Sequence, residues 1–210
     1  IFSAILIATG YPRFYIDADV VITGEFILKM SLVIESKKYL AVSPLPYFET
    51  SNSSWFVKAY YKIHTQLPAS KEGIGGSGVY CLSEKGRTRF NKFPAVIADD
   101  CFVRLNFAPE ERLTLTDCRS IVFTPKTLKE LISIKTRSTY GTLELKKKYP
   151  DLYFNIGQGN SKGLMILLAK PFQWPSLFIY ILVKIITRSK ALKRFNNEKI
   201  LWEGDEGSRF

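Results

Sequence analysis

Short apolar runs alternate with longer amphipathic stretches along most of this chain. Runs at residues 14–16, 39–43, 79–82 and 120–123 have the length of strands, and Pro44 and Pro46 are expected to end the second of them. Helical periodicity covers residues 24–35 and 55–66, and another helix is expected to start at Pro125 and Thr127. Strands that alternate with helices in this way predict an α/β fold built on a sheet.

The pattern changes after residue 163. Residues 163–187 are strongly apolar, but charged residues and prolines interrupt them, and the longest uncharged stretch, 171–183, is shorter than the ~20 apolar residues of a spanning helix. Trp174, Tyr180 and a basic cluster at residues 188–194 are typical of a segment that lies in a membrane interface. A buried helix in a larger oligomer is the alternative. We therefore expect an α/β domain over residues 1–150 and a membrane-associating tail over residues 151–210.

Composition and charge narrow the class of partner. The chain has 210 residues, enough to bury one core, and 30 Lys and Arg against 19 Asp and Glu give a net charge of +11. Such an excess favours a polyanionic partner, for example a nucleotide diphosphate, a lipid phosphate or an anionic membrane surface. Nucleic acid is not expected, because no nucleic-acid-binding motif is present. Cys81, Cys101 and Cys118 lack metal-type spacing and predict free thiols in a reducing compartment.

The first apolar run leads into two aspartates, Asp17 and Asp19. If the strand continues through them, both side chains point to one side, because side chains alternate along a strand. Ligands of α/β proteins bind outside the carboxyl ends of strands, and paired carboxylates there usually hold a divalent cation together with substrate phosphates. A surface turn with two solvated aspartates is the alternative, because the motif is short and common.

A second acidic pair, Asp99 and Asp100, follows the apolar run 93–98 and precedes a short helix at 101–107. A helix N-cap explains one of these aspartates but not both. The other has the chemistry of a general base, a role that typically contributes ~10²–10⁴-fold to a rate.

A glycine-rich loop at residues 73–78 precedes the strand-like run 79–82. Glycines allow backbone to approach a ligand closely, but the spacing is that of neither a P-loop nor a dinucleotide-binding turn, and a flexible loop is the alternative. Trp55 starts the second helix and could face a sugar, although aromatic residues of this helix are mostly expected in the core. His64, the single histidine, is expected to be structural or exposed.

In their order, these motifs resemble family 2 glycosyltransferases of the GT-A fold, in particular the membrane-associated branch that includes hyaluronan, cellulose and ceramide glucosyl synthases. The resemblance covers residues 14–149. The sequence Ile-Asp-Ala-Asp-Val is similar to the family's D-x-D motif, which implies Asp17 and Asp19 as metal ligands and Asp17 as a donor contact. The loop Gly-Gly-Ser-Gly is similar to an acceptor-side loop, which implies acceptor contacts at Gly76 and Ser77, with Trp55 as a further candidate.

The sequence Ala-Asp-Asp-Cys-Phe is similar to the family's acidic catalytic site, which implies Asp100 as the general base with Asp99 beside it on the donor side. The family's Q-x-x-R-W element falls on residues 134–138, where only Arg137 matches. The missing Gln and Trp argue against processive polymer synthesis, while the guanidinium of Arg137 remains suited to the donor diphosphate. The family's N-terminal nucleotide-binding strands are not in this sequence, which begins with an apolar run at Ile1, so we expect a preceding part.

The resemblance implies an inverting glycosyltransferase that depends on Mg²⁺ or Mn²⁺. It would move a sugar from a nucleotide-sugar donor to a saccharide or lipid-linked acceptor, in cell-surface polysaccharide or glycolipid synthesis, at the cytoplasmic face of the cell membrane. The implied architecture is a GT-A (Rossmann-like) sheet flanked by helices with a membrane-associating helical tail. A different class stays open, a non-catalytic membrane-surface assembly subunit that retains the fold.

Overall fold

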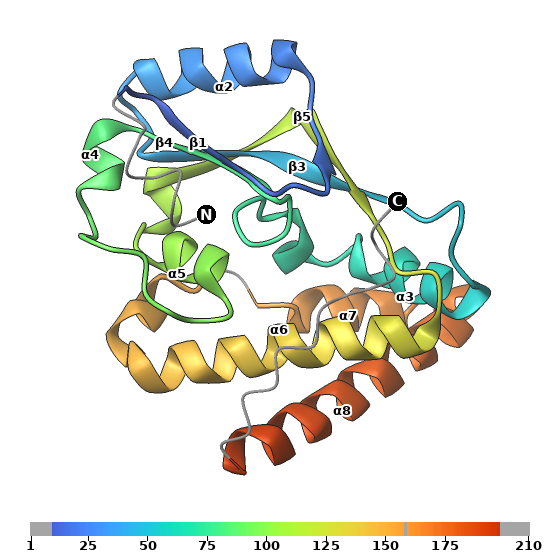
Figure 1. The fold of residues 1–210 in the computed structure, drawn as a ribbon. Coiled ribbons are helices and arrows are strands. Elements are labelled where there is room, and N and C mark those ends of the chain that lie inside the picture. Colours follow the sequence, from blue (N-terminus) through green and yellow to red (C-terminus); the bar gives the residue numbers. More distant parts are fainter. Residues whose placement is uncertain (1–9, 158, 198–210) are drawn as a thin grey trace.

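The computed structural model describes residues 10–157 and 159–197 and shows helices packed on both faces of one mixed five-stranded sheet (Figure 1). The strands are β1 (Arg13–Ile16), β2 (Val20–Val21), β3 (Ala41–Glu49), β4 (Val79–Leu82) and β5 (Arg112–Phe123). Their order is β1-β4-β3-β5-β2; β3 and β5 run parallel, and the other neighbours are antiparallel. The α/β class is confirmed, with a mixed sheet.

The helices form a thin layer above the sheet and a thick one below it. They are α2 (Gly24–Glu35), α3 (Trp55–His64), α4 (Glu84–Arg87), α5 (Asp99–Leu105), α6 (Leu128–Lys148), α7 (Ser161–Leu168) and α8 (Trp174–Asn196), with 3-10 turns at Pro68–Lys71, Pro109–Glu111, Pro150–Asn155 and Pro171–Gln173. Among the described helices, α2 covers one face of the sheet, and α5, α6 and α8 lie on the other side (Figure 1). Thr127 starts α6 as predicted: its hydroxyl accepts from the Glu130 N–H, and the Glu130 carboxylate accepts from the Thr127 N–H.

Strand β3 corrects one prediction, because it runs through Pro44 and Pro46 instead of ending there. Beyond Val42, β3 pairs with β5 but no longer with β4, so one side of the strand is an open edge. Prolines are tolerated at such an edge because no neighbouring strand needs their missing N–H groups. The register also shifts between Pro44 and Leu45.

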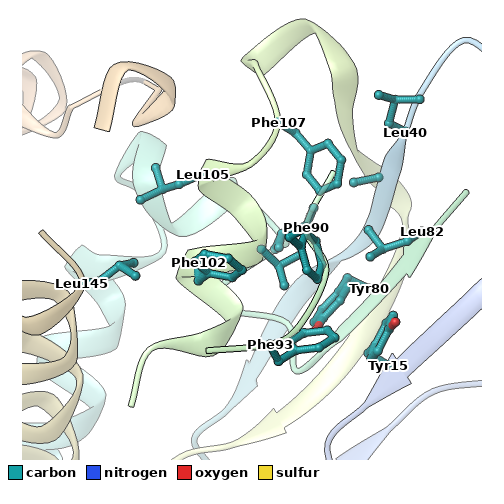
Figure 2. Close-up of a cluster of buried hydrophobic side chains, with 13 residues drawn as sticks. Tyr15, Leu40, Tyr80, Leu82, Phe90, Phe93, Phe102, Leu105, Phe107 and Leu145 are labelled. Carbon is teal, nitrogen blue, oxygen red and sulfur yellow. The ribbon is translucent and has the colours of Figure 1, made fainter. Parts of the chain in front are cut away.

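One core cluster fixes α5 against the sheet (Figure 2). Tyr15 of β1 stacks on Tyr80 of β4 with ring centroids 4.8 Å apart, and Phe93 packs on Tyr15 at 5.4 Å. Phe102 and Leu105 bury the inner face of α5 in the same cluster. The ends of β1 and β4 are therefore held rigidly relative to the start of α5.

A second core cluster joins α3, α6 and α8. Tyr60 of α3 stacks on Tyr180 of α8 at 5.1 Å, and Leu131 and Val183 are buried beside them. One face of the predicted tail thus packs on the α/β part of this same chain. The domain division at residue 150 stays a prediction.

The other face of this helical region carries many exposed apolar side chains. They are Met165, Ile166, Leu168, Phe172, Trp174, Phe178, Ile181, Leu182 and Ile185. Within the described ranges, no single helix has the length and apolar content needed to cross a membrane; α7 together with residues 171–196 reaches both only as a pair bent by 110°. The apolar run at residues 1–8 lies outside the described residues.

Candidate active site

A cavity of about 220 Å³ opens between the end of β1, the start of α5 and the first half of α6. It is lined by Tyr15, Asp17, Gly75, Gly78, Val79, Tyr80, Ile97, Ala98, Asp99, Asp100, Ile134, Arg137 and Ser138. Residues of four motifs that are far apart in the sequence therefore meet in one place: Asp17 of the first aspartate pair, both members of the second pair, the glycine loop and Arg137 on α6.

Asp17 stands directly after β1 and is anchored to the glycine loop. Its N–H donates to the carbonyl of Gly78 at 2.8 Å, and its own carbonyl accepts from the Val20 N–H at 3.3 Å. Because β1 ends at Ile16 and Asp19 lies in a turn, strand alternation does not place the two carboxylates on one side, contrary to the expectation. Asp17 and Asp19 are both exposed, but only Asp17 lines the cavity. Desolvation and the charges of Asp100, Asp19 and Asp99 raise the pKa of Asp17 to about 6.

Asp99 and Asp100 form the first turn of α5, and neither is its N-cap, which is Ala98. A carboxylate oxygen of Asp99 accepts from the Asp100 N–H at 2.9 Å, and Oδ1 of Asp100 accepts from the Cys101 N–H at 2.6 Å. Burial, followed by the charge of Asp99, raises the pKa of Asp100. A carboxylate held in one orientation with an increased proton affinity has the properties of a general base.

The glycine loop closes over these acids through residues with left-handed backbone. Gly75 has φ +97° and Gly78 has φ +64°. A Cβ on Gly78 would lie 2.4 Å from Cγ2 of Val20 and 3.2 Å from Oδ2 of Asp17, so a side chain there would displace the turn that carries Asp17. The absence of a side chain is what lets the loop meet the aspartate.

The predicted acceptor residues are placed differently from the acids. Ser77 is buried, and its hydroxyl donates to the Val79 carbonyl at 2.6 Å and accepts from the Val79 N–H at 3.2 Å, so it is engaged inside the loop. Gly76 does not line the cavity, whereas its neighbour Gly75 does. Trp55 is 59% exposed at the start of α3 and packs edge-on against Phe56, away from the cavity lining.

His64 belongs to the core between α3 and α8. It stacks on Tyr60 at 5.6 Å and packs on Phe48 at 5.5 Å, and its Nδ1 is buried without a hydrogen-bond partner. Burial, with the nearby charges of Lys135 and Lys184, lowers its pKa to about 2. The ring is therefore neutral, and these contacts describe a packed aromatic residue.

Several cavity residues were missed by sequence reasoning. Ile134, Arg137 and Ser138 have the i, i+3, i+4 spacing of one helix face, so the first and last could have been found from Arg137. Tyr15 and Tyr80 carry no such signal, because an aromatic residue in a strand is expected to be part of the core. Both residues are in fact almost fully buried.

The carboxylates of the cavity lack a basic partner. In the described part of the chain, no ion pair joins Asp17, Asp99 or Asp100 to a lysine or arginine. The same residues contain no group of three or more His, Cys, Asp or Glu that could hold a metal ion on its own. Mg²⁺ is usually bound by one or two carboxylates plus substrate phosphates and water, and Asp17 suits that mode. The site therefore fits a cation that is shared with a phosphate-bearing ligand.

Comparison with solved structures finds a similar fold in a glycosyltransferase. The structure is similar to the mannosyltransferase PcManGT from Pyrobaculum calidifontis, solved in complex with GDP-Man and Mn²⁺, with a TM-score of 0.51 and 17% sequence identity. The similarity covers 95% of this chain and 54% of that one, so this chain spans about half the length of PcManGT. No protein-family model and no curated protein sequence matches the chain. Membership of family 2 and of its membrane branch stays a prediction.

Proposed function

We propose that this chain is the catalytic part of a metal-dependent glycosyltransferase that moves a sugar from a nucleotide-sugar donor to an acceptor hydroxyl and inverts the anomeric centre. The observation that carries the proposal is the single cavity that gathers Asp17, Asp99, Asp100 and Arg137 within a glycosyltransferase fold. PcManGT was solved with GDP-Man and Mn²⁺, which supports a nucleotide-sugar donor and Mn²⁺ or Mg²⁺ here.

On the donor side, Asp17 would hold the cation together with the diphosphate, and Asp19 follows it in the same turn. The bound cation would supply Lewis-acid stabilisation of the leaving nucleoside diphosphate. Arg137 reaches the cavity from α6, and its planar guanidinium can donate two parallel hydrogen bonds to phosphate oxygens. Asp99 stands beside Asp100 and belongs to the donor side in this proposal.

Asp100 is the general base. Its Oδ1 is held by the Cys101 N–H, which leaves Oδ2 directed toward the glycine loop, 3.8 Å from the position of a Cβ on Gly75. The raised pKa lets this carboxylate take the proton of an acceptor hydroxyl as the hydroxyl attacks the anomeric carbon. Attack from the face opposite the leaving group inverts the configuration.

A membrane location completes the proposal. The exposed apolar side chains of α7, residues 171–173 and α8 form one face, and Arg188, Lys190 and Lys193 follow it on α8. An apolar face followed by basic residues suits the interface of an anionic bilayer, here the cytoplasmic face of the cell membrane. The acceptor is then a saccharide or lipid-linked group, in cell-surface polysaccharide or glycolipid synthesis.

Calorimetric titration of GDP and UDP, with and without Mn²⁺, into the intact protein tests the proposal. We expect one nucleotide to bind in a Mn²⁺-dependent way, and Asp17→Asn to weaken that binding at least about tenfold, since one charged ligand is worth on the order of 1.4 kcal/mol or more. Asp151→Asn is the matched control, because Asp151 is an exposed aspartate outside the cavity. If the folded protein binds neither nucleotide, the non-catalytic assembly subunit becomes the better explanation.

A further inference from the structure

A second and larger cavity lies on the other side of the glycine loop. Its volume is about 620 Å³, within the roughly 300–1,000 Å³ typical of small-molecule sites. Residues of the loop, the end of α5, the start of β5 and the segment 154–157 line it. Of the motifs found in the sequence, only the glycine loop contributes to this cavity, through Gly73 and Ile74.

The two cavities share the glycine loop as a common wall. Gly73 and Ile74 line the larger cavity, whereas Gly75 and Gly78 line the one that holds the acids. Arg104 lies one helical turn after Asp100 on α5 and lines the larger cavity. The position of a Cβ on Gly75 is 3.8 Å from Oδ2 of Asp100 and 3.9 Å from Nε of Arg104. Asp100 of the first cavity and Arg104 of the second therefore both lie close to Gly75.

The wall of the larger cavity is a fixed polar network. Glu72 accepts from Nη1 of Arg104 at 2.6 Å and from Nη2 of Arg112 at 3.3 Å. The Arg112 side chain, only 9% exposed, also donates to the carbonyls of Arg104 and Phe107 at 2.8 and 3.2 Å. Nε of Arg104 is buried and has no hydrogen-bond partner. The network thus holds its charged groups in set orientations.

Phe154 adds an apolar surface to this polar cavity. Its side chain is 92% exposed, more than any other large hydrophobic residue in the described part of the chain. Gly157, at φ +80°, ends the same segment and packs against the Glu72–Arg112 ion pair. A Cβ on Gly157 would lie 2.5 Å from Oε1 of Glu72. A flat exposed ring beside oriented carboxylate and guanidinium groups matches a sugar, whose C–H face packs on an aromatic ring while its hydroxyls form hydrogen bonds.

We infer that the larger cavity is the acceptor subsite and binds a saccharide, with Phe154 as the platform for the sugar ring and the Glu72–Arg104 pair as the hydroxyl-binding group. The assignment as acceptor subsite rests on the proposed transferase function. In an inverting transfer the base works on the face of the sugar opposite the leaving group. The larger cavity adjoins the position of that base, because Oδ2 of Asp100 and Nε of Arg104, a residue that lines the larger cavity, lie 3.8 and 3.9 Å from the position of a Cβ on Gly75.

The first test is direct saccharide binding by the intact protein without nucleotide. Methyl glycosides of mannose, glucose, galactose and glucuronic acid serve as probes in saturation-transfer NMR and titration. We expect at least one to bind, and Phe154→Ala to weaken its binding about tenfold through loss of the apolar contact. Leu28→Ala is the control, because Leu28 is an apolar residue on α2 that is 63% exposed and lies outside both cavities. Glu72→Gln, which keeps the size of the side chain, should weaken the binding of the same sugar.

The second test is a kinetic comparison with donor and Mn²⁺ present. Phe154→Ala should raise the acceptor KM about tenfold and leave the donor KM unchanged, while Leu28→Ala changes neither. Unchanged saccharide binding and acceptor KM in Phe154→Ala, or no binding of any probe, would overturn the assignment while Mn²⁺-dependent nucleotide binding stands. If a saccharide binds in a Phe154-dependent way but no nucleotide binds, the proposed transferase function would be wrong. The cavity would then be a saccharide site but not an acceptor subsite.

Discussion

Asp100 is the residue on which the proposed chemistry depends most directly. Asp100→Asn keeps the size of the side chain and removes its ability to take a proton. We expect transfer to fall by ~10²–10⁴-fold or more, with Mn²⁺-dependent nucleotide affinity nearly unchanged. Product formation and calorimetry on the same preparation measure both quantities, with Asp151→Asn as the control. Transfer at the original rate would refute the assignment of Asp100 as the base.

His64 gives a stability test that does not depend on catalysis. Its pKa is about 2 in the folded protein against 6.5 for the free side chain, so below pH 6.5 the unfolded state binds more protons and stability falls as the pH falls. At about pH 5 this amounts to roughly 2 kcal/mol. His64→Phe keeps the ring contacts with Tyr60 and Phe48 but does not titrate.

The variant should therefore gain about 4–8 °C in Tm relative to the wild type when the pH is lowered from about 7.5 to about 5. Thermal unfolding in buffers of equal ionic strength measures the difference. A Tm difference between the two proteins that stays constant with pH would show that His64 takes up its proton in the folded state.

At the residue scale, the sequence selected five charged residues as members of motifs. The structure brings Asp17, Asp99, Asp100 and Arg137 into one cavity, whereas Asp19 does not line it. Ser77 was selected in the same way, but a serine hydroxyl can stabilise a turn as well as bind a ligand. Here it donates to the Val79 carbonyl within the loop. Only the three-dimensional structure distinguishes these two uses.

The glycine loop is the element whose backbone shape holds the site together. Gly78→Ala would place a Cβ 2.4 Å from Val20 on a residue with positive φ, which costs about 1–3 kcal/mol. We expect Tm to fall by about 2–10 °C and Mn²⁺-dependent nucleotide binding to weaken about tenfold, because Asp17 must move.

Gly24→Ala is the matched control for this prediction. Gly24 starts α2, and a Cβ there would have no atom within 4 Å, so neither Tm nor nucleotide binding should decrease. Equal behaviour of the two variants in calorimetry would mean that the fit between Gly78 and Asp17 is unimportant for the site.

At the element scale, helices were predicted more accurately than strands. The capping box at Thr127 and the apolar stripe of residues 24–35 are local signals, and both helices start where expected. The extent of β3 is instead decided by which neighbour it pairs with on each side, and that is set by residues about 70 positions away in β5. A proline rule applied to the strand alone could not include this information.

At the scale of the whole molecule, the main feature is an exposed apolar surface on α8. Trp174 and Phe178 of α8 are 55% and 65% exposed, and basic residues follow them on the same helix. We expect the protein to bind vesicles that contain phosphatidylserine more tightly than pure phosphatidylcholine vesicles, and added salt to reduce the difference.

Replacing both Trp174 and Phe178 by alanine should weaken vesicle binding about tenfold or more, since each buried ring contributes on the order of 1 kcal/mol or more. Phe154→Ala is the control, because its ring is even more exposed but belongs to the larger cavity. Cosedimentation with vesicles measures all three proteins. Equal binding by the double variant and the wild type would exclude this face as the membrane contact.

At the scale of the molecule, the sequence predicted the class of fold but not the position of the tail. Apolar content alone fits a membrane segment and a core helix equally well, and α8 combines both properties: one face packs on α3 and α6, and the other is exposed. The network of Glu72, Arg104 and Arg112 was likewise not predictable, because its members come from three elements and none stands in a motif.

The shared wall between the two cavities has a consequence for protein engineering. Within the loop 73–78, Gly73 and Ile74 line the larger cavity and Gly75 and Gly78 line the other, and a Cβ on Gly75 would lie 3.8 Å from Asp100 and 3.9 Å from Arg104. A library that reshapes this loop to accept a new sugar will therefore alter nucleotide affinity as well. Selection for sugar specificity will change nucleotide affinity, and the reverse. Specificity toward the two ligands will be easiest to separate at Phe154 and Arg137, which lie on opposite sides of that wall.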